Sequence, residues 1–265
     1  MDKQLITGLI PAAGTASRLW PLPFSKELYP VNHGKVTDQQ LHHPKTTMQY
    51  LLENMQKGGA TNVIIVIRDG KFDIPSYFGD GSWLNLKLAY LMMGVPFGPP
   101  YTIDQAYSFV ADQIVLFGFP DILVTPDDAF FQLINKLQSS DAEAILGLHK
   151  VTDPKNWDMV KLTPEGGVSD IIIKSEKTGY DHAWAIMAWR YSFSDFLHNY
   201  TTQLLKANNQ GKLFDGKLWR EPIISDVVKA AVHEGMKIDT LVFENGKIMD
   251  VGTPERIRQS INFFE

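Results

Sequence analysis

Short apolar runs rich in β-branched residues alternate along the chain with longer segments whose apolar residues recur every three or four positions. Runs of the first kind are typical of buried strands, and segments of the second kind are typical of amphipathic helices. The expected strands are Leu5–Ile10, Val63–Ile67, Ile122–Thr125, Ala144–Leu148, Val168–Ile173, Ala183–Trp189 and Lys247–Val251. The expected helices are Thr47–Gln56, Phe130–Leu137, Ser194–Lys206, Ile223–His233 and Pro254–Ile261. This alternation predicts an α/β fold, with a mixed, mainly parallel sheet flanked by helices.

Turn and capping residues support some of these boundaries. Gly58-Gly59 follows the first expected helix as a stop signal, and Thr253-Pro254-Glu255 places a capping threonine and a proline where the last helix begins. The polar segment Asn32–His43 is expected to be a surface loop. Because no repeat, low-complexity tract or clear linker interrupts the pattern, we expect residues 1–265 to form a single domain, with no further domain after the last motif.

Composition narrows the classes of function. The 265 residues carry a formal net charge of -5 and include no cysteine, which excludes disulfides and thiolate metal sites. The acidic balance argues against a nucleic-acid groove, because phosphate backbones are bound by clustered Lys and Arg. Pro11 interrupts the apolar N-terminal run, and no apolar stretch approaches the roughly 18 residues that a membrane span needs. We therefore expect a cytoplasmic protein that binds neither nucleic acid nor membrane.

The first candidate site follows the first expected strand. Ala12, Ala13, Gly14 and Thr15 are small residues that let the backbone turn sharply and bring its N–H groups close to a ligand. Arg18 and Lys26 come directly after this turn. An arginine fork and a lysine charge suit a triphosphate, whose charge shifts during transfer. From these residues alone, an ordinary strand–loop connection with two solvated cations explains the pattern equally well.

A longer motif separates these two interpretations. The stretch Ala12–Leu22, continued by Ser25–Val31, resembles the signature of the sugar-1-phosphate nucleotidylyltransferases, roughly A-G-G-x-G-T-R-L-x-P followed by [P/S]-K-x-L-x-P-[V/I]. The glucose-1-phosphate thymidylyltransferases are most similar, since serine also precedes the lysine there. The resemblance implies a Rossmann-like core in which the small-residue loop holds the nucleotide. Arg18 and Lys26 would contact the phosphates. Ala16 replaces a glycine of the motif.

Two aspartates are the expected metal ligands. Asp127 and Asp250 each follow an expected strand, and open α/β sheets bind ligands at the carboxyl ends of their strands. Either residue by itself fits a cap or turn position equally well. The segments Thr125–Phe130 and Met249–Pro254 resemble two further motifs of the family, whose aspartates bind magnesium. The resemblance, which runs from about Leu5 to Phe264, therefore implies Mg²⁺ held by Asp127 and Asp250.

The positions that would read the base depart in part from the family. Gln105 continues the base-side loop and is expected to contact the nucleotide. Met93 stands where a base-reading glutamine is usual, and Thr102 replaces a loop glycine. Because a methionine cannot read the polar edge of a pyrimidine, the sequence leaves the nucleotide open among dTTP, UTP and CTP.

At the positions that would bind the phosphorylated acceptor, one residue matches the family and three differ from it. Lys174 aligns with the lysine that meets the acceptor phosphate. Trp157-Asp158 replaces a Tyr-Gly pair, Ile173 replaces a glutamate that binds sugar hydroxyls, and Ile186 replaces a glycine. We expect these changes to make the pocket smaller and drier, so that glucose 1-phosphate is a poor acceptor.

These observations predict a magnesium-dependent nucleotidyltransferase. It would transfer a nucleoside monophosphate from a nucleoside triphosphate to a phosphorylated acceptor, expected to be a sugar 1-phosphate, and release pyrophosphate. One alternative is a cytidylyltransferase that acts on a phospho-alcohol such as phosphocholine or a polyol phosphate. Another is a catalytically silent subunit that binds a nucleotide sugar. Assembly into a homo-oligomer is compatible with each of these.

Overall fold

The computed structural model describes residues 4–19, 21–31, 45–94, 97–175, 179–209 and 221–264. The expected loop Asn32–His43 lies outside these residues. The described part contains a nine-stranded sheet built from β1 (Ile6–Pro11), β4 (Asn62–Arg68), β5 (Lys87–Met93), β6 (Ile114–Gly118), β8 (Ala144–Lys150), β9 (Asp158–Leu162), β10 (Val168–Ile173), β11 (His182–Trp189) and β12 (Ile238–Val242). Its helices are α1 (Thr47–Lys57), α2 (Asp73–Phe78), α3 (Pro99–Asp104), α4 (Ala129–Gln138), α5 (Tyr191–Asn209), α6 (Ile224–His233) and α7 (Pro254–Ser260).

The sheet is mixed and mainly parallel, as the sequence predicts. One path of strands runs β10-β9-β11-β6-β1-β4-β5, and β8 pairs with both β11 and β12. Strands β5, β4, β1 and β6 pair in parallel, and so do β8 and β12. Strand β11 is antiparallel to β6, β8 and β9, and β10 is antiparallel to β9. Only β10 and β11 therefore run against the direction shared by the other described strands of this sheet.

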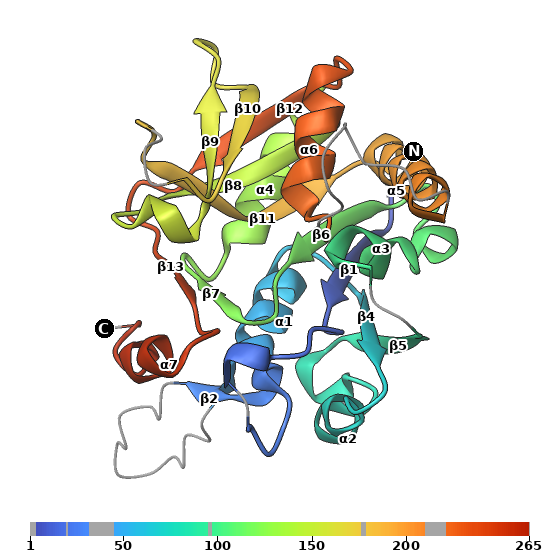
Figure 1. Ribbon diagram of the computed structural model, residues 1–265, viewed down its shortest axis with the longest axis vertical. Helices are drawn as coiled ribbons and strands as arrows, with labels where there is room; N and C mark the ends of the chain where they lie inside the picture. The colour runs from blue at the N-terminus through green and yellow to red at the C-terminus, as the bar shows by residue number, and fades with distance from the viewer. Residues whose placement is uncertain are drawn as a thin grey trace.

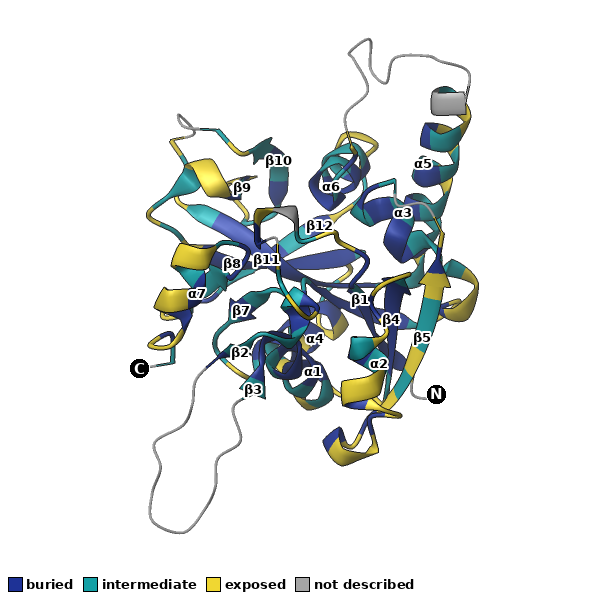
Figure 2. Ribbon diagram, turned by 60° about the horizontal axis from the view of Figure 1, so that its bottom comes forward, coloured by how far each residue is buried: buried dark blue, intermediate teal, exposed yellow. Residues whose placement is uncertain are grey.

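Helices cover both faces of the sheet (Figure 1). Helices α1, α2 and α4 bury their apolar side chains in one core cluster, and α3, α5 and α6 bury theirs in another. The central strands contribute alternately to the two clusters: in β1, Ile10 packs on the first side and Leu9 on the second. A strand covered on both faces has apolar residues in succession, which is why β1 and β4 stand out in the sequence. In Figure 2 these strands are buried, while the outer sides of the helices are exposed.

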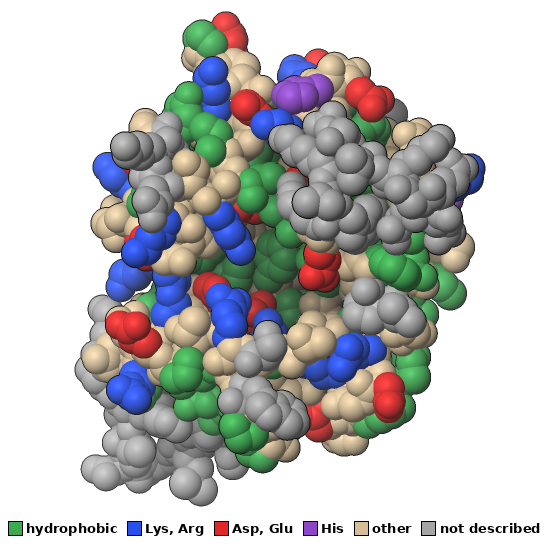
Figure 3. Space-filling model, viewed as in Figure 1, with side chains coloured by type: hydrophobic (Ala, Val, Ile, Leu, Met, Phe, Trp, Pro, Cys, Tyr) green, Lys and Arg blue, Asp and Glu red, His purple; other side chains and the backbone are tan. Residues whose placement is uncertain are grey.

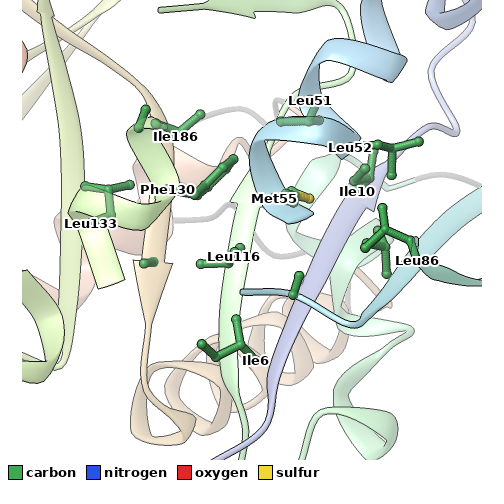
Figure 4. Packing of buried hydrophobic residues seen from close by; sticks show 14 of the residues in the cluster. Ile6, Ile10, Leu51, Leu52, Met55, Leu86, Leu116, Phe130, Leu133 and Ile186 are labelled. Atoms are coloured by element: carbon green, nitrogen blue, oxygen red, sulfur yellow. The ribbon is translucent and has the colours of Figure 1, made fainter. Parts of the chain in front are cut away.

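The first cluster fixes the position of α1 and α4 on the sheet. Leu51, Leu52 and Met55 of α1 lie over β1 and β6, and Phe130 of α4 points toward Ile186 of β11 (Figure 4). The expected boundaries of α1 are close to those observed. The Thr46 side chain caps its start by accepting a hydrogen bond from the Gln49 N–H, and the helix ends at Lys57, directly before Gly58-Gly59.

Two short two-stranded sheets lie outside the main one. Strands β2 (Pro30–Val31) and β3 (Lys45–Thr46) form the first, and β7 (Ile122–Val124) and β13 (Ile248–Asp250) form the second. In the β7–β13 ribbon, Asp250 is the register partner of Ile122, and the Val251 N–H donates to the Asp121 carbonyl at 2.9 Å. The ribbon therefore brings the C-terminal part of the chain to the end of β6. None of the described helices is both long and apolar enough to cross a membrane.

Candidate active site

A cavity of about 340 Å³ opens at the carboxyl ends of β1 and β6. Its wall includes Pro11 from the end of β1, the segment Phe119–Ile122 after β6, residues at the ends of β9 and β10, and the start of α6. Figure 3 shows this face hollowed near its centre, with hydrophobic side chains in the depth and charged side chains along the lower edge. The size fits a small-molecule ligand, and its place at the strand ends is where open α/β sheets bind ligands.

The small-residue loop forms one side of this cavity. Ala13 and Gly14 line it, while Ala12 is fully buried behind them and donates its N–H to the Val66 carbonyl at 2.8 Å. Thr15 faces a neighbouring hollow that shares Gly14. Ala16 has a φ of 52°, in the left-handed region that favours glycine. The loop therefore needs this conformation at the position where the family motif has glycine, and alanine adopts it here under strain.

Arg18 lies against Asp250 at the edge of the cavity. The arginine Nη2 is 3.8 Å from Asp250 Oδ2, and the two side chains are 63% and 26% exposed. Gly252 makes this approach possible: its N–H donates to Asp250 Oδ1 at 2.7 Å, and a Cβ built on it would lie 2.8 Å from Arg18 Nη2. Any larger residue at position 252 would push the two charged groups apart.

Lys26 reaches into the cavity and pairs with Asp121. Its Nζ lies 2.5 Å from Asp121 Oδ2, and the two side chains are only 17% and 14% exposed. Burial acts to lower the pKa of Lys26, but the charges of Asp121, Glu27 and Asp250 outweigh it, so the pKa is raised. Burial likewise acts to raise the pKa of Asp121, and Lys26 outweighs it, so that pKa is lowered. Both groups therefore stay charged near neutral pH.

The two residues on either side of Lys26 are held by contacts with charged residues that the sequence analysis missed. The N–H and hydroxyl of Ser25 both donate to the carboxylate of Asp73, at 2.5 and 2.6 Å. Glu27, only 1% exposed, accepts from Lys71 Nζ at 2.6 Å. Asp73 and Lys71 lie more than forty residues along the chain at the start of α2, so no local pattern links them to Lys26. These contacts fix the direction from which the Lys26 side chain enters the cavity.

The structure does not bring Asp127 to the cavity beside Asp250. Asp127 is 77% exposed, forms an ion pair with Lys57 of α1, and is absent from the described lining of the cavity. Asn54 of α1 bonds the Pro126 carbonyl and the Phe130 N–H, which keeps this turn on the α1 side of the sheet. Asp121, in contrast, lines the cavity together with Asp250.

The different positions of Asp121 and Asp127 follow from two neighbouring apolar runs. The run Ile114–Gly118 forms β6 in the middle of the main sheet, whereas Ile122–Val124 forms only the short β7. The aspartate at the carboxyl end of the central strand is thus Asp121. The apolar run Ile114–Gly118, whose five residues are all buried, was the sequence signal for this strand. Because β7 pairs with β13, Asp121 lies next to the register partner of Asp250.

The base-side expectations are met only in part. Gln105 falls outside the described cavity lining; it ends α3, and its Nε2 donates to the Tyr101 carbonyl at 3.2 Å. Met93 is buried in the core and pairs with Arg68 of β4. Thr102 does line the cavity, beside Gly98 and Pro99. The start of α3 and Gly98 before it therefore form this part of the wall, and neither Met93 nor Gln105 belongs to its described lining.

Lys174 lines the opposite side of the cavity, as expected. It follows β10 directly and has a φ of 38°, a strained conformation for a non-glycine residue. Ile173 and Ile186, in contrast, are absent from the described lining. Ile186 is 1% exposed and packs in the core, against Gly147 of β8. These two substitutions therefore give no support to the expectation of a smaller, drier pocket. Asp158 does line the cavity, and Trp157 beside it does too.

The carboxylates of the cavity suit a cation that shares its ligands with a substrate. Within the described residues, no group of three or more His, Asp or Glu side chains is arranged to hold a metal by itself. Asp121 and Asp250 provide two carboxylates. Mg²⁺ is commonly bound by one or two carboxylates together with water and substrate phosphates, so this donor set fits it.

Comparison with known proteins identifies the family and agrees with the fold. The family model described as nucleotidyl transferase matches residues 7–265. A low-salt glycan biosynthesis nucleotidyltransferase of Haloferax volcanii is 25% identical over 96% of this chain and 64% of its own length. A glucose-1-phosphate thymidylyltransferase of Streptomyces griseus is 24% identical over 92% of this chain and 62% of its own length. The chain thus spans slightly less than two thirds of the curated relatives it matches.

Solved structures share the fold over nearly the whole chain. A Bacillus anthracis protein provisionally assigned as a glucose-1-phosphate thymidylyltransferase has a TM-score of 0.79 at 17% identity, covering 97% of this chain and 94% of that one. A UDP-glucose pyrophosphorylase from Acinetobacter baumanii has a TM-score of 0.75 at 15% identity, covering 98% and 93%. The resemblance drawn from the motifs at Arg18 and Lys26 is confirmed, and the chain belongs to the nucleotidyl transferase family.

Proposed function

We propose that this protein transfers a nucleoside monophosphate from a nucleoside triphosphate to a phosphorylated acceptor, a sugar 1-phosphate, and releases pyrophosphate. One observation carries the proposal: three cations, Arg18, Lys26 and Lys174, and two carboxylates, Asp121 and Asp250, line one cavity although they come from four separate parts of the chain. Phosphoryl transfer needs little more than the positioning of its reactants and the stabilisation of shifting negative charge. The names of the relatives support the sugar phosphate as the acceptor class.

The reaction follows from the placement of the cations. An oxygen of the acceptor phosphate attacks the α-phosphorus, a new P–O bond forms, and the bond to the β-phosphate oxygen breaks, with pyrophosphate leaving with that electron pair. Lys26 and Arg18 lie on the side of the small-residue loop, where they would neutralise the leaving pyrophosphate. Lys174 lies across the cavity, where it would hold the acceptor phosphate in line. No covalent enzyme intermediate is required.

Asp121 and Asp250 would hold Mg²⁺ in this scheme. When bound, the metal would supply positive charge to the phosphates of both substrates. Arg18 and Lys26, which already contact these carboxylates in the free protein, would then be released toward the phosphate oxygens. The pairing of each carboxylate with a cation thus keeps four charged groups in the cavity in the absence of substrate.

The test is a screen of dTTP, UTP and CTP against hexose 1-phosphates, phosphocholine and polyol phosphates, with pyrophosphate release as the readout. We expect release to depend on Mg²⁺. Asp121→Asn and Asp250→Asn should lower turnover by at least about a hundredfold, because each removes a ligand of the charge-neutralising metal. Asp127→Asn is the matched control and should keep wild-type turnover, since its side chain faces α1. A loss in Asp127→Asn with full activity in Asp121→Asn would reverse the assignment.

A further inference from the structure

Asp158 lines the acceptor side of the cavity, and one oxygen of its carboxylate is buried without a hydrogen-bond partner among the described residues. It is the first residue of β9, and the register pairs it with Ile173, directly before Lys174. Ile173 is partly buried against the second core cluster, and Asp158 lines the cavity. A carboxylate therefore stands beside the lysine proposed to hold the acceptor phosphate.

Two further residues fix this carboxylate in place. The Ser225 hydroxyl donates to Asp158 Oδ2 at 2.6 Å, and the Trp184 indole N–H donates to the same hydroxyl at 3.0 Å. Ser225 and Trp184 are 1% and 5% exposed, and both line the cavity. Because the three residues come from β9, α6 and β11, packing of the main sheet holds the carboxylate in one orientation.

The second oxygen of this carboxylate is left without a partner. Oδ1 is buried and accepts no hydrogen bond from any described residue. Burial raises the pKa of Asp158, and the Ser225 hydrogen bond and the charge of Lys174 only partly offset this. An ionised carboxylate has about four lone-pair sites, and leaving a buried acceptor unsatisfied is costly. A hydrogen-bond donor on a bound ligand would remove that cost.

We propose that Asp158 is a specificity-determining residue, whose carboxylate accepts a hydrogen bond from a hydroxyl or amino group of the phosphorylated acceptor. This inference rests on the proposed function of the cavity. The positive charge of Lys174 already acts on this carboxylate, which favours a neutral hydroxyl over an ammonium group as the donor. The acceptor would thus carry its phosphate at Lys174 and a donor group at Asp158, with Trp157 and Trp184 forming the apolar part of the wall.

The test compares a hexose 1-phosphate with its monodeoxy and amino-deoxy forms. Binding to the full chain is measured by calorimetry with Mg²⁺ and a methylene-bridged nucleoside triphosphate, and pyrophosphate release is measured separately. In the wild type, removal of one particular hydroxyl should weaken binding at least about tenfold, as expected for a hydrogen bond to a charged group. In Asp158→Ala the hydroxylated and deoxy forms should bind equally. Equal discrimination in the wild type and Asp158→Ala would overturn the proposal.

Further variants separate recognition from loss of structure. Asp158→Asn keeps the shape of the side chain and one acceptor oxygen, so it should retain most of the preference for a hydroxyl but lose a preference for an ammonium group. Ser225→Ala should reduce the discrimination between the hydroxylated and deoxy acceptors, because the Asp158 carboxylate loses the hydrogen bond that fixes its orientation. Asp170 lies on the neighbouring strand and forms an ion pair with Lys229. Asp170→Asn is therefore the matched control and should keep the wild-type discrimination between the hydroxylated and deoxy acceptors. A wild type that discriminates in binding but releases no pyrophosphate would refute the proposed function alone.

Discussion

Removing the Lys26 side chain should lower the free energy of unfolding as well as the activity. Without the lysine, the Asp121 carboxylate stays buried but has no counter-charge. The two groups are 2.5 Å apart, and both side chains are more than four fifths buried. Breaking one partner of a buried ion pair costs about 3–5 kcal/mol, and we expect the lower end because both groups face a cavity that admits water. For a chain of this size, about 3 kcal/mol corresponds to a fall in melting temperature of roughly 6–12 °C.

A double-mutant cycle isolates this contribution. Lys26→Ala, Asp121→Asn and the double variant would be compared by urea denaturation at pH 7 and low salt. We expect the double variant to be less destabilised than the sum of the single variants, because a neutral asparagine no longer needs the lysine. Lys57→Ala is the control, since its pair with Asp127 is largely exposed and should contribute less than about 1 kcal/mol.

The contribution of the Lys26–Asp121 pair to stability should depend on pH, and the pKa of Asp121 gives the direction of this dependence. The pKa of Asp121 is lowered in the folded protein, so its contribution to stability is present above the pKa of the unfolded chain. This contribution is lost as pH falls through the folded-state pKa. The difference in the free energy of unfolding between the wild type and Lys26→Ala should therefore become smaller as the pH is lowered. A Lys26→Ala variant no less stable than Lys57→Ala, or strictly additive effects in the cycle, would refute the reasoning.

Three other predictions follow from the geometry. Ala16→Gly should raise the free energy of unfolding by about 0.5–1 kcal/mol, measured by denaturant titration, because a φ of 52° strains alanine and not glycine. Asp73→Ala, which removes both hydrogen bonds to Ser25, should lower kcat roughly tenfold with little change in KM, because Lys26 is no longer aimed; a change in KM alone would contradict this. Burial lowers the pKa of His149 to about 4, so stability should fall by about 3 kcal/mol as pH drops from about 6.5 to 4. His149→Gln should lose this dependence in acid titrations followed by fluorescence.

Much of the fold could be predicted because the central strands are covered on both faces. The expected strand Val63–Ile67 differs from β4 by one residue at each end, since a strand buried on both sides is apolar throughout. Strands β5, β6, β9 and β12 were not predicted. Strand β9 begins with Asp158 and contains Lys161, so its apolar pattern is too short to separate from that of a loop. Strand β5 lies at one edge of the sheet, where several of its residues are partly or fully exposed.

The site was predictable where its residues lie close together in the sequence. Arg18 and Lys26 belong to one local motif, and both line the cavity. Asp121 was missed because the choice between two apolar runs depends on which run joins the main sheet, which is a matter of long-range pairing. Asp73 and Ser225 act only through contacts with residues far away in the sequence. Such partners become visible only when the strands are assembled.

The β7–β13 ribbon has a consequence for how this sequence tolerates insertions and deletions. Asp121 and Asp250 are separated by more than a hundred residues, yet a ladder of three residue pairs sets their spacing. Loss or gain of one residue within Ile122–Val124 or Ile248–Asp250 would shift the register and turn every following side chain to the opposite face. The long stretch between the two strands can change in length without moving either carboxylate, provided that its own strands still pair. Length variation among related chains should therefore concentrate between the ribbon strands and spare the few residues within them.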